Sequence, residues 1–278
     1  MTPGTVSRRL PLVWLALHRR RRMLLTLLIA MVVFETLIVV IAGAVPNGEL
    51  FGARRTPPGG AFKAFSGSNG DVSIASYPGL LGAGLTHPVW IALQLTVIGS
   101  LGAAAVAADV ESGTIELLMT RPVSRRRLLA ERAGALIVAS VLLNAAATLA
   151  VALGVAFSPK LREAVPESGV FSAGLLGCAL AFCLIGPVLA VSALSRRRAH
   201  VVGAAVALGA GGFALNFVAL AWSPAGPLRY LSPFHYYAPG DALAHGGLPW
   251  TSPVVLIGVG LLGLLAAFRL LERRDLAV

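Results

Sequence analysis

Charged residues are scarce in this chain. Asp, Glu, Lys and Arg make up 13% of its 278 residues, whereas 56% of the residues are hydrophobic. Soluble domains carry roughly 25% charged and 45–50% apolar residues. Together with a mean hydropathy of +0.81, this shortage of charge excludes an ordinary soluble domain and predicts an integral membrane protein.

Catalytic and metal-binding patterns are also missing. The sequence has no G-x-x-x-x-G-K-[ST] phosphate loop, no H-E-x-x-H zinc pattern and no G-x-S-x-G elbow. Its two cysteines, Cys178 and Cys183, lie in one apolar run on different sides of a helix, so we interpret them as small buried hydrophobes. The histidines show no ligand spacing, and His235 and His245 near Asp241 leave only a weak metal-site alternative. We expect no catalytic residue, no metal and no cofactor bound by this chain.

Long apolar runs are the main feature that the sequence does have. Six of them are close to the ~20 residues that a membrane-spanning helix needs, which predicts an all-α protein with six transmembrane helices. The first run is longer than the roughly 7–15 residues of a signal-peptide core, so we interpret it as a retained span, with a cleaved signal peptide as the alternative. The expected spans are residues 23–45, 88–108, 133–157, 170–194, 201–222 and 253–271.

The formal net charge of +11 has two explanations. In a soluble chain it would suggest nucleic-acid binding, but in membrane proteins Lys and Arg collect on the cytoplasmic side. Seventeen of the 23 basic residues fall on one side of a six-span topology, which predicts that both termini are cytoplasmic and that no nucleic acid is bound. These are Arg8, Arg9, Arg19, Arg20, Arg21, Arg22, Arg121, Arg125, Arg126, Arg127, Arg132, Arg196, Arg197, Arg198, Arg269, Arg273 and Arg274.

This topology divides the chain into two parts. Residues 1–22 place Trp14 and several leucines between arginine clusters, which is typical of a helix that lies in the inner membrane interface. Residues 23–278 form a single six-span transmembrane domain. Its outer loops are expected at residues 46–87, 158–169 and 223–252.

The longest inner loop, between the second and third spans, has a pattern of its own. Ile115, Leu118 and Met119 share a face at i, i+3, i+4 spacing, which predicts a short amphipathic helix that Pro122 ends. A helix this short is marginal alone in water and needs a surface to pack on. That surface is either the membrane interface or another protein; a charged loop that only anchors the topology is the alternative.

Three segments resemble one family. The run ESGTIELLMTRPVSRRRLLAERA (111–133) is similar to the segment between the second and third helices of ABC-2 type permeases, the membrane subunits of many prokaryotic ATP-binding-cassette exporters. The run SPFHYYAPGDALAHG (232–246) resembles the aromatic segment before their last span, and FRLLERRDL (268–276) resembles their arginine-rich end. The resemblance extends over nearly the whole chain.

The resemblance implies a permease subunit in a prokaryotic cell membrane. The inner loop would be a coupling helix seated in a separate ATPase subunit, which would bind ATP and Mg²⁺. A second permease chain, identical or a close relative, and membrane lipids would be further partners, and no particular substrate is indicated. Ile115, Leu118 and Met119 would form the apolar contact with the ATPase, and Glu111, Glu116 and Arg121 its polar rim.

Two further features concern a translocation path. Glu35 lies near the middle of the first span, where an ionised acid is costly, so it either faces a path or bonds to a neighbour such as Asn144 or Gln94. The resemblance also suggests an outer gate before the last span, for which plain interfacial anchoring of aromatics is the favoured alternative. The candidate gate residues are Pro233, Phe234, Tyr236 and Tyr237.

Two other functions stay open. An ion-coupled secondary transporter would use Glu35, but it would need charged groups in several spans, and only Glu35 lies deep in one. A membrane assembly protein without transport activity would not need the amphipathic inner loop.

Overall fold

The computed structural model describes residues 11–45, 65–69, 72–114 and 124–274. Over these ranges the chain is helical and contains no strand, which confirms the all-α prediction. Six of its helical segments are long and apolar enough to cross a membrane. In chain order the helices are α1 (Pro11–Arg19), α2 (Arg21–Ala44), α4 (Tyr77–Thr86), α5 (Pro88–Ala103), α6 (Ala107–Glu111), α8 (Arg125–Phe157), α9 (Pro159–Ala164), α10 (Glu167–Leu194), α11 (Arg198–Ala221), the 3₁₀ helix η1 (Ser223–Leu231), α12 (Pro233–Tyr236), α13 (Pro239–His245) and α14 (Thr251–Arg273).

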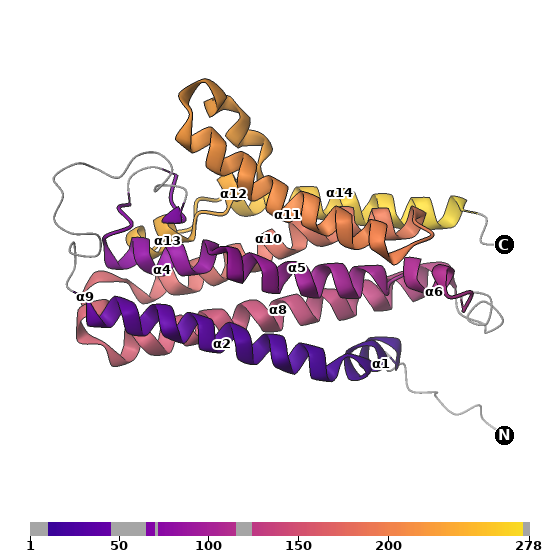
Figure 1. Cartoon of the computed structure of the whole chain (residues 1–278), viewed down its shortest axis with the longest axis horizontal. Coiled ribbons are helices and arrows are strands. Elements are labelled where there is room, and N and C mark those ends of the chain that lie inside the picture. The colour runs from indigo at the N-terminus through magenta and orange to yellow at the C-terminus, as the bar shows by residue number, and fades with distance from the viewer. Residues whose placement is uncertain (1–10, 46–64, 70–71, 115–123, 275–278) are drawn as a thin grey trace.

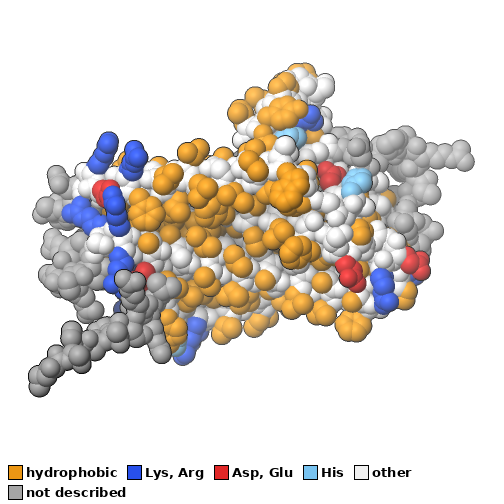
Figure 2. Space-filling model, turned by 180° about the vertical axis from the view of Figure 1, so that it is seen from behind, with side chains coloured by type: hydrophobic (Ala, Val, Ile, Leu, Met, Phe, Trp, Pro, Cys, Tyr) orange, Lys and Arg blue, Asp and Glu red, His pale blue; other side chains and the backbone are white. Residues whose placement is uncertain are grey.

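The long helices run side by side in an elongated bundle (Figure 1). α1, α6 and the last turn of α14 lie at one end, and α4, α9 and α13 lie at the other (Figure 1). Figure 2 shows Lys and Arg side chains gathered at the first of these ends and hydrophobic side chains covering the middle. We call the two ends the basic end, which holds α1, α6 and residues 195–198, and the far end, which holds α4, α9, α12 and α13.

The helices differ in how much of their surface other helices cover. α10 is the central helix, in contact with α5, α8, α11, α13 and α14, and most of its residues are buried. α2, α11 and α14 are peripheral and leave large apolar side chains uncovered, such as Val33 at 62% and Leu262 at 70% exposure. An apolar outer face suits lipid, because lipid tails are as apolar as the side chains that they contact.

Glycines bring α14 against α10. A Cβ on Gly186 would lie only 2.1 Å from the carbonyl oxygen of Gly260, and a Cβ on Gly263 would lie 2.4 Å from the amide nitrogen of Pro187. Contacts this short require the absence of side chains at both helices, as is common where membrane helices pack closely.

The second helical span begins earlier than the expected 88–108. It is a helix pair, α4 and α5, that starts at Tyr77 within the expected loop 46–87 and ends at Ala103. The Ser76 hydroxyl accepts the N–H of Gly79 and so starts α4 (3.2 Å). Pro88 disfavours helix at His87 and offers no N–H of its own, so the pair is interrupted there.

The third span also begins earlier than the expected 133. α8 starts at Arg125, where the Ser124 hydroxyl accepts the N–H of Arg127 (3.3 Å). With 33 residues α8 is about 50 Å long, which exceeds the ~30 Å hydrocarbon layer. The arginine cluster therefore belongs to the first turns of a long helix. The predicted N-terminal helix is present as α1, which lies against α8.

Candidate functional site

The predicted coupling helix lies largely outside the described residues. Its candidates Ile115, Glu116, Leu118, Met119 and Arg121 all fall in residues 115–123, so their grouping on one face stays a prediction. The structure describes the frame on both sides of this segment: α6 and a turn before it, and Ser124 and α8 after it.

Arg132 of α8 binds groups in α6 and just after α5, which precede residues 115–123 in the chain. The Nη1 atom of Arg132 donates to the carbonyl oxygens of Ala104 (2.8 Å) and Ala105 (2.9 Å), just past the end of α5. The same guanidinium forms an ion pair with Asp109 of α6. Carbonyl groups at a helix C-terminus lack intrahelical partners and favour a cation. Arg132 therefore ties α5 and α6 to the start of α8.

Glu111 joins the two inner connections of the bundle. Its carboxylate accepts the N–H of Arg198, the first residue of α11, at 2.9 Å. Two residues further on, Gly113 has a φ of +70°, the left-handed conformation that commonly ends a helix. The residue predicted as part of a polar rim is thus a contact between α6 and α11.

The end of α14 completes the frame. Arg274 donates from Nη1 to the carbonyl oxygens of Ala193 (2.7 Å) and Ser195 (3.1 Å) at the end of α10. Arg125 in turn donates to the carbonyl oxygen of Arg274 (2.7 Å), and Arg126 pairs with Glu272. The ends of five long helices, α5, α8, α10, α11 and α14, are therefore linked at the basic end.

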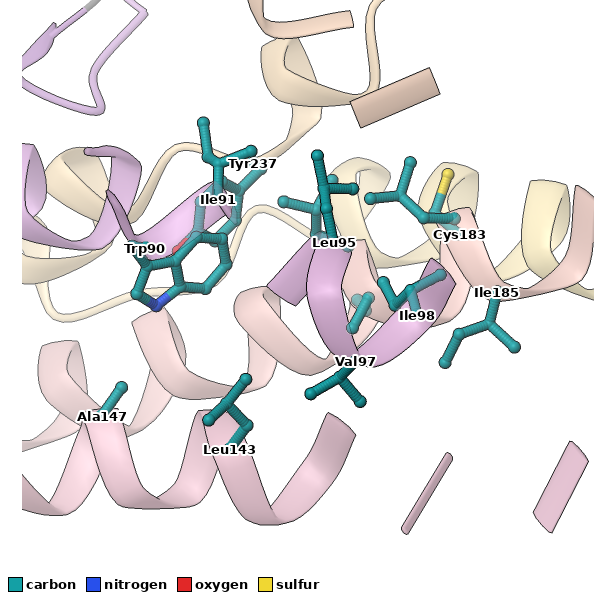
Figure 3. Packing of buried hydrophobic residues seen from close by; sticks show 14 of the residues in the cluster. Trp90, Ile91, Leu95, Val97, Ile98, Leu143, Ala147, Cys183, Ile185 and Tyr237 are labelled. Carbon is teal, nitrogen blue, oxygen red and sulfur yellow. The ribbon is translucent and has the colours of Figure 1, made fainter. Parts of the chain in front are cut away.

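At the far end, Tyr237 lies at the break between α4 and α5. Its hydroxyl donates to the carbonyl oxygen of Leu85 (2.9 Å), and its ring stacks on that of Trp90 with centroids 5.3 Å apart. Figure 3 shows the two rings face to face, with Trp90 on the side toward Ala147 of α8. Tyr237, which lies between α12 and α13, thus packs against the break between α4 and α5.

The other gate candidates lie beside Tyr237 but in different surroundings. Phe234 is buried and meets Phe213 of α11 edge-on, with centroids 5.6 Å apart. Pro233 packs near Gly212 of α11. Tyr236 instead reaches the carbonyl oxygen of Tyr230 in η1 (3.3 Å), nearer the surface. Three of the four gate candidates, Pro233, Phe234 and Tyr237, therefore pack against α5 or α11. Tyr236 does not belong to this contact.

Glu35 lies inside the bundle beside the same helix break. Its side chain is fully buried, and a Cβ added to Gly84 of α4 would lie 3.1 Å from its Oε2. Neither carboxylate oxygen has a hydrogen-bond partner among the described residues. Of the two alternatives for Glu35, a hydrogen bond to Asn144 or Gln94 is therefore wrong within that part of the chain.

The reason is that the expected partners point elsewhere. Asn144 donates from Nδ2 to the carbonyl oxygen of Ser140 on its own helix (2.9 Å). Gln94 is buried, and both ends of its amide lack a partner in the described ranges, as does the indole N–H of Trp90. The sequence suggested Gln94 only as a neighbour of Glu35, and it did not suggest Trp90. The reason is that the sequence of an apolar run does not show which side of the helix a Trp faces.

A second polar cluster fastens residues 65–69 to the far end. The carboxylate of Asp241 accepts the backbone N–H of Asn69 (3.0 Å) and the hydroxyl of Ser68. Asn69 donates from Nδ2 to the carbonyl oxygen of His235 (2.8 Å), and its Oδ1 lies 3.1 Å from the Nδ1 of that ring. Burial lowers the pKa of His235, as does the nearby Arg229. His235 and Asp241, two residues of the metal-site alternative, thus form hydrogen bonds with residues 68 and 69. Among the described residues, no group of His, Cys, Asp and Glu could hold a metal ion.

Comparison with known proteins supplies the family. The model of the family described as ABC-2 family transporter protein matches residues 15–276, a range that includes all six spanning segments. Among curated proteins, none matches the chain in sequence. The resemblance carried by the three quoted segments is thereby confirmed.

Proposed function

The chain belongs to the ABC-2 family of transporter proteins, and we propose that it is the permease half of an exporter driven by a separate ATPase. Family membership makes the chain a multi-pass membrane component of an ABC transporter, itself non-catalytic, whose partner is an ATP-binding-cassette subunit. The direction of transport, the coupling residues and the oligomer are parts of the proposal.

We place the basic end on the cytoplasmic side of a prokaryotic cell membrane. Most of the Lys and Arg residues belong to this end, and such residues collect on the cytoplasmic side of membranes. The segment 115–123 then faces the compartment that contains ATP. The far end, with α4, α9, α12 and α13, would face the outside.

The observation that carries the coupling proposal is the frame around residues 115–123. Arg132 links the end of α5 and α6 to α8, and Glu111 links α6 to α11. A partner that moves this segment would therefore act on three spans together. The apolar face of Ile115, Leu118 and Met119 would enter a groove of the ATPase, and Glu116 and Arg121 would set its register, since such charges add specificity more than affinity.

We further propose that a second permease chain completes the pathway. Peripheral helices with uncovered apolar faces give both lipid and a second copy room to bind. Phe234 and Tyr237, closed against α5 and α11, would form the outer gate, with Glu35 behind it. Opening this gate requires Tyr237 to leave Trp90 and Leu85.

The first experiment is purification of the tagged protein from its native membrane in mild detergent, followed by mass spectrometry of the proteins that accompany it. We expect an ATP-binding-cassette subunit in stoichiometric amount, and we expect it to disappear from the double variant Ile115→Asp, Leu118→Asp. The matched control is Leu194→Asp, which places the same charge on an exposed leucine at the end of α10. An ATPase that remains bound to the double variant would refute the coupling assignment.

The unpartnered carboxyl of Glu35 favours a second candidate, ion-coupled transport. The substitution Glu35→Gln keeps the shape and removes the charge, so it separates the two functions. An ATP-driven permease keeps ATP-dependent transport in this variant, whereas an ion-coupled carrier loses gradient-driven transport and is indifferent to a catalytically inactive ATPase subunit.

A further inference from the structure

A groove of about 380 Å³ opens on the surface of the bundle between the far-end halves of α8 and α10. Ala152, Leu153 and Ala156 of α8 line one side, and Val170 and Phe171 of α10 line the other. This volume is within the range of pockets that bind small molecules. The groove belongs to neither the coupling segment nor the gate.

The groove exists because α10 changes its neighbour along its length. Midway, α10 packs tightly on α8: a Cβ on Gly174 would lie 2.4 Å from the Oγ1 of Thr148, and a Cβ on Gly177 would lie 2.4 Å from the Oδ1 of Asn144. Near its start, α10 packs on α13 instead, where a Cβ on Gly169 would lie 2.6 Å from the carbonyl oxygen of Ala242. The first turns of α10 therefore pack on α13, and Arg162 of α9 lines the groove between α8 and α10 at that end.

The open end of the groove carries two charges of opposite sign. Arg162 of α9 and Glu167 in the first turn of α10 both line it, and both are exposed. Arg162 donates from Nη2 to the carbonyl oxygen of Ala156 in the groove wall. Of the ion pairs that the described residues form, none includes Arg162 or Glu167. Since a guanidinium has five N–H donors, Arg162 keeps donors for a ligand.

The position of these charges relative to the membrane indicates the ligand. α9 follows the end of α8, so Arg162 lies at the far end of a spanning helix, and the walls of the groove beside it are mainly apolar. Arg binds phosphate through strong charge-assisted hydrogen bonds. An acid next to it disfavours a net-anionic headgroup and favours a cationic amine.

We propose that the α8–α10 groove binds an amine-bearing phospholipid of the far-end leaflet. One acyl chain lies between Ala156 and Phe171, the phosphate contacts Arg162, and the amine lies beside Glu167. The proposal depends on membrane insertion of the bundle and not on the ATPase. Its failure would therefore leave the coupling proposal untouched, and the reverse also holds.

The test uses the full chain in lipid nanodiscs that contain phosphatidylethanolamine with a photoactivatable diazirine in one acyl chain. After illumination, mass spectrometry maps the labelled peptides. We expect labelling on residues 152–156 and 170–171, and stronger competition by unlabelled phosphatidylethanolamine than by phosphatidylglycerol. Loss of the charged hydrogen bonds in Arg162→Glu should lower labelling about tenfold or more. Ala156→Trp fills the groove and should lower it at least as much.

Matched controls lie on the same helices. Lys160→Glu makes the same charge change on α9 at a residue that does not line the groove, and Ala145→Trp adds the same ring to an exposed position of α8 away from it. Both should label like the wild type. Because Arg162 is exposed, Arg162→Glu tests the proposal even if Ala156→Trp fails to fold.

Three results would overturn the proposal. One is equal labelling of the groove in wild type, Arg162→Glu and Ala156→Trp. Another is a preference for phosphatidylglycerol, which would remove the role of Glu167. The third is conversion of a dimer to a monomer by Ala156→Trp with unchanged lipid labelling, which would make the groove an interface between two copies of the chain.

Discussion

The two ends of the bundle are held together by different interactions. At the basic end, Arg132, Arg274 and Glu111 bind the carbonyl or N–H groups of neighbouring helix ends, near water. At the far end, the contacts are the stacked rings of Trp90 and Tyr237, backbone packing at glycines, and hydrogen bonds between uncharged groups, apart from those that the Asp241 carboxylate accepts. Charged groups at a partly exposed helix end can exchange a protein partner for water, whereas stacked aromatic rings and backbone contacts at glycines have no such substitute. We infer that the basic end is suited to transmit movement and the far end to remain closed until it is driven.

The largest effect is expected where backbones touch at the far end. A Cβ on Gly240 would lie 2.2 Å from the carbonyl oxygen of Ser66, so Gly240→Ala must push residues 65–69 away from α13. Overpacking of this kind costs about 1–3 kcal/mol, and we expect the upper part of that range because the obstacle is backbone. Thermal unfolding in detergent measures the loss. Gly247→Ala is the control, since nothing lies within 4 Å of its Cβ position, and equal destabilisation of both variants would contradict the packing argument.

An intermediate effect is expected from Arg132→Ala at the basic end. The substitution leaves Asp109 and the carbonyl groups of Ala104 and Ala105 without their guanidinium, and hydrogen bonds to charged groups contribute about 1.5–3 kcal/mol. We also expect α6 to exchange its amide hydrogens faster, which hydrogen–deuterium exchange mass spectrometry can follow.

Its control is Arg126→Ala, which breaks the more exposed pair with Glu272. A surface pair contributes about 0–1 kcal/mol, so stability and α6 exchange should hardly change. If the two arginine variants behaved alike, the basic end would be held by general charge and not by the specific contacts of Arg132.

The smallest effect is expected from Tyr237→Phe. The ring and its stacking on Trp90 remain, and only the hydrogen bond to the carbonyl oxygen of Leu85 is lost, which is worth about 1 kcal/mol. The comparison variant Tyr237→Ala, which stands outside this order of effects, should cost about 3–5 kcal/mol because it also removes a buried aromatic ring. Chemical denaturation of both variants compares the two contributions, and an equal loss in both would show that the ring contributes nothing.

Much of the fold was predictable from short-range patterns. Six apolar runs and the placement of arginines are enough to predict six spans, because the bilayer imposes a length on each helix. Helix ends were less predictable. α8 begins eight residues before the expected 133 and α4 begins within an expected loop, because Ser124 and Ser76 cap helices that continue beyond the apolar runs.

The contacts of the candidate site were not predictable from the sequence. The inner-loop pattern and the family resemblance indicate a coupling segment, which stays a prediction, and the structure describes α6 before it and α8 after it. The sequence patterns did not predict which partner each polar side chain binds. Arg132 counted only as a marker of topology, Glu111 only as part of a rim, and Asp241 only as a weak metal ligand, although each bonds a specific partner across the fold.

The sequence by itself determined the class of this protein: the scarcity of charge, the six apolar runs and the motifs between residues 111 and 276 identify a multi-pass ABC-2 transporter subunit. Only the tertiary structure decided that Glu35 is buried without a partner, that Tyr237 closes the break in the second span, and that α8 and α10 part to form a groove. The physical reason is the separation along the chain of the residues that interact. Membrane insertion and helix formation depend on residues near one another along the chain. In contrast, partners such as Arg132 and Asp109, or Ser68 and Asp241, are 23 and 173 residues apart and meet only after the helices have packed.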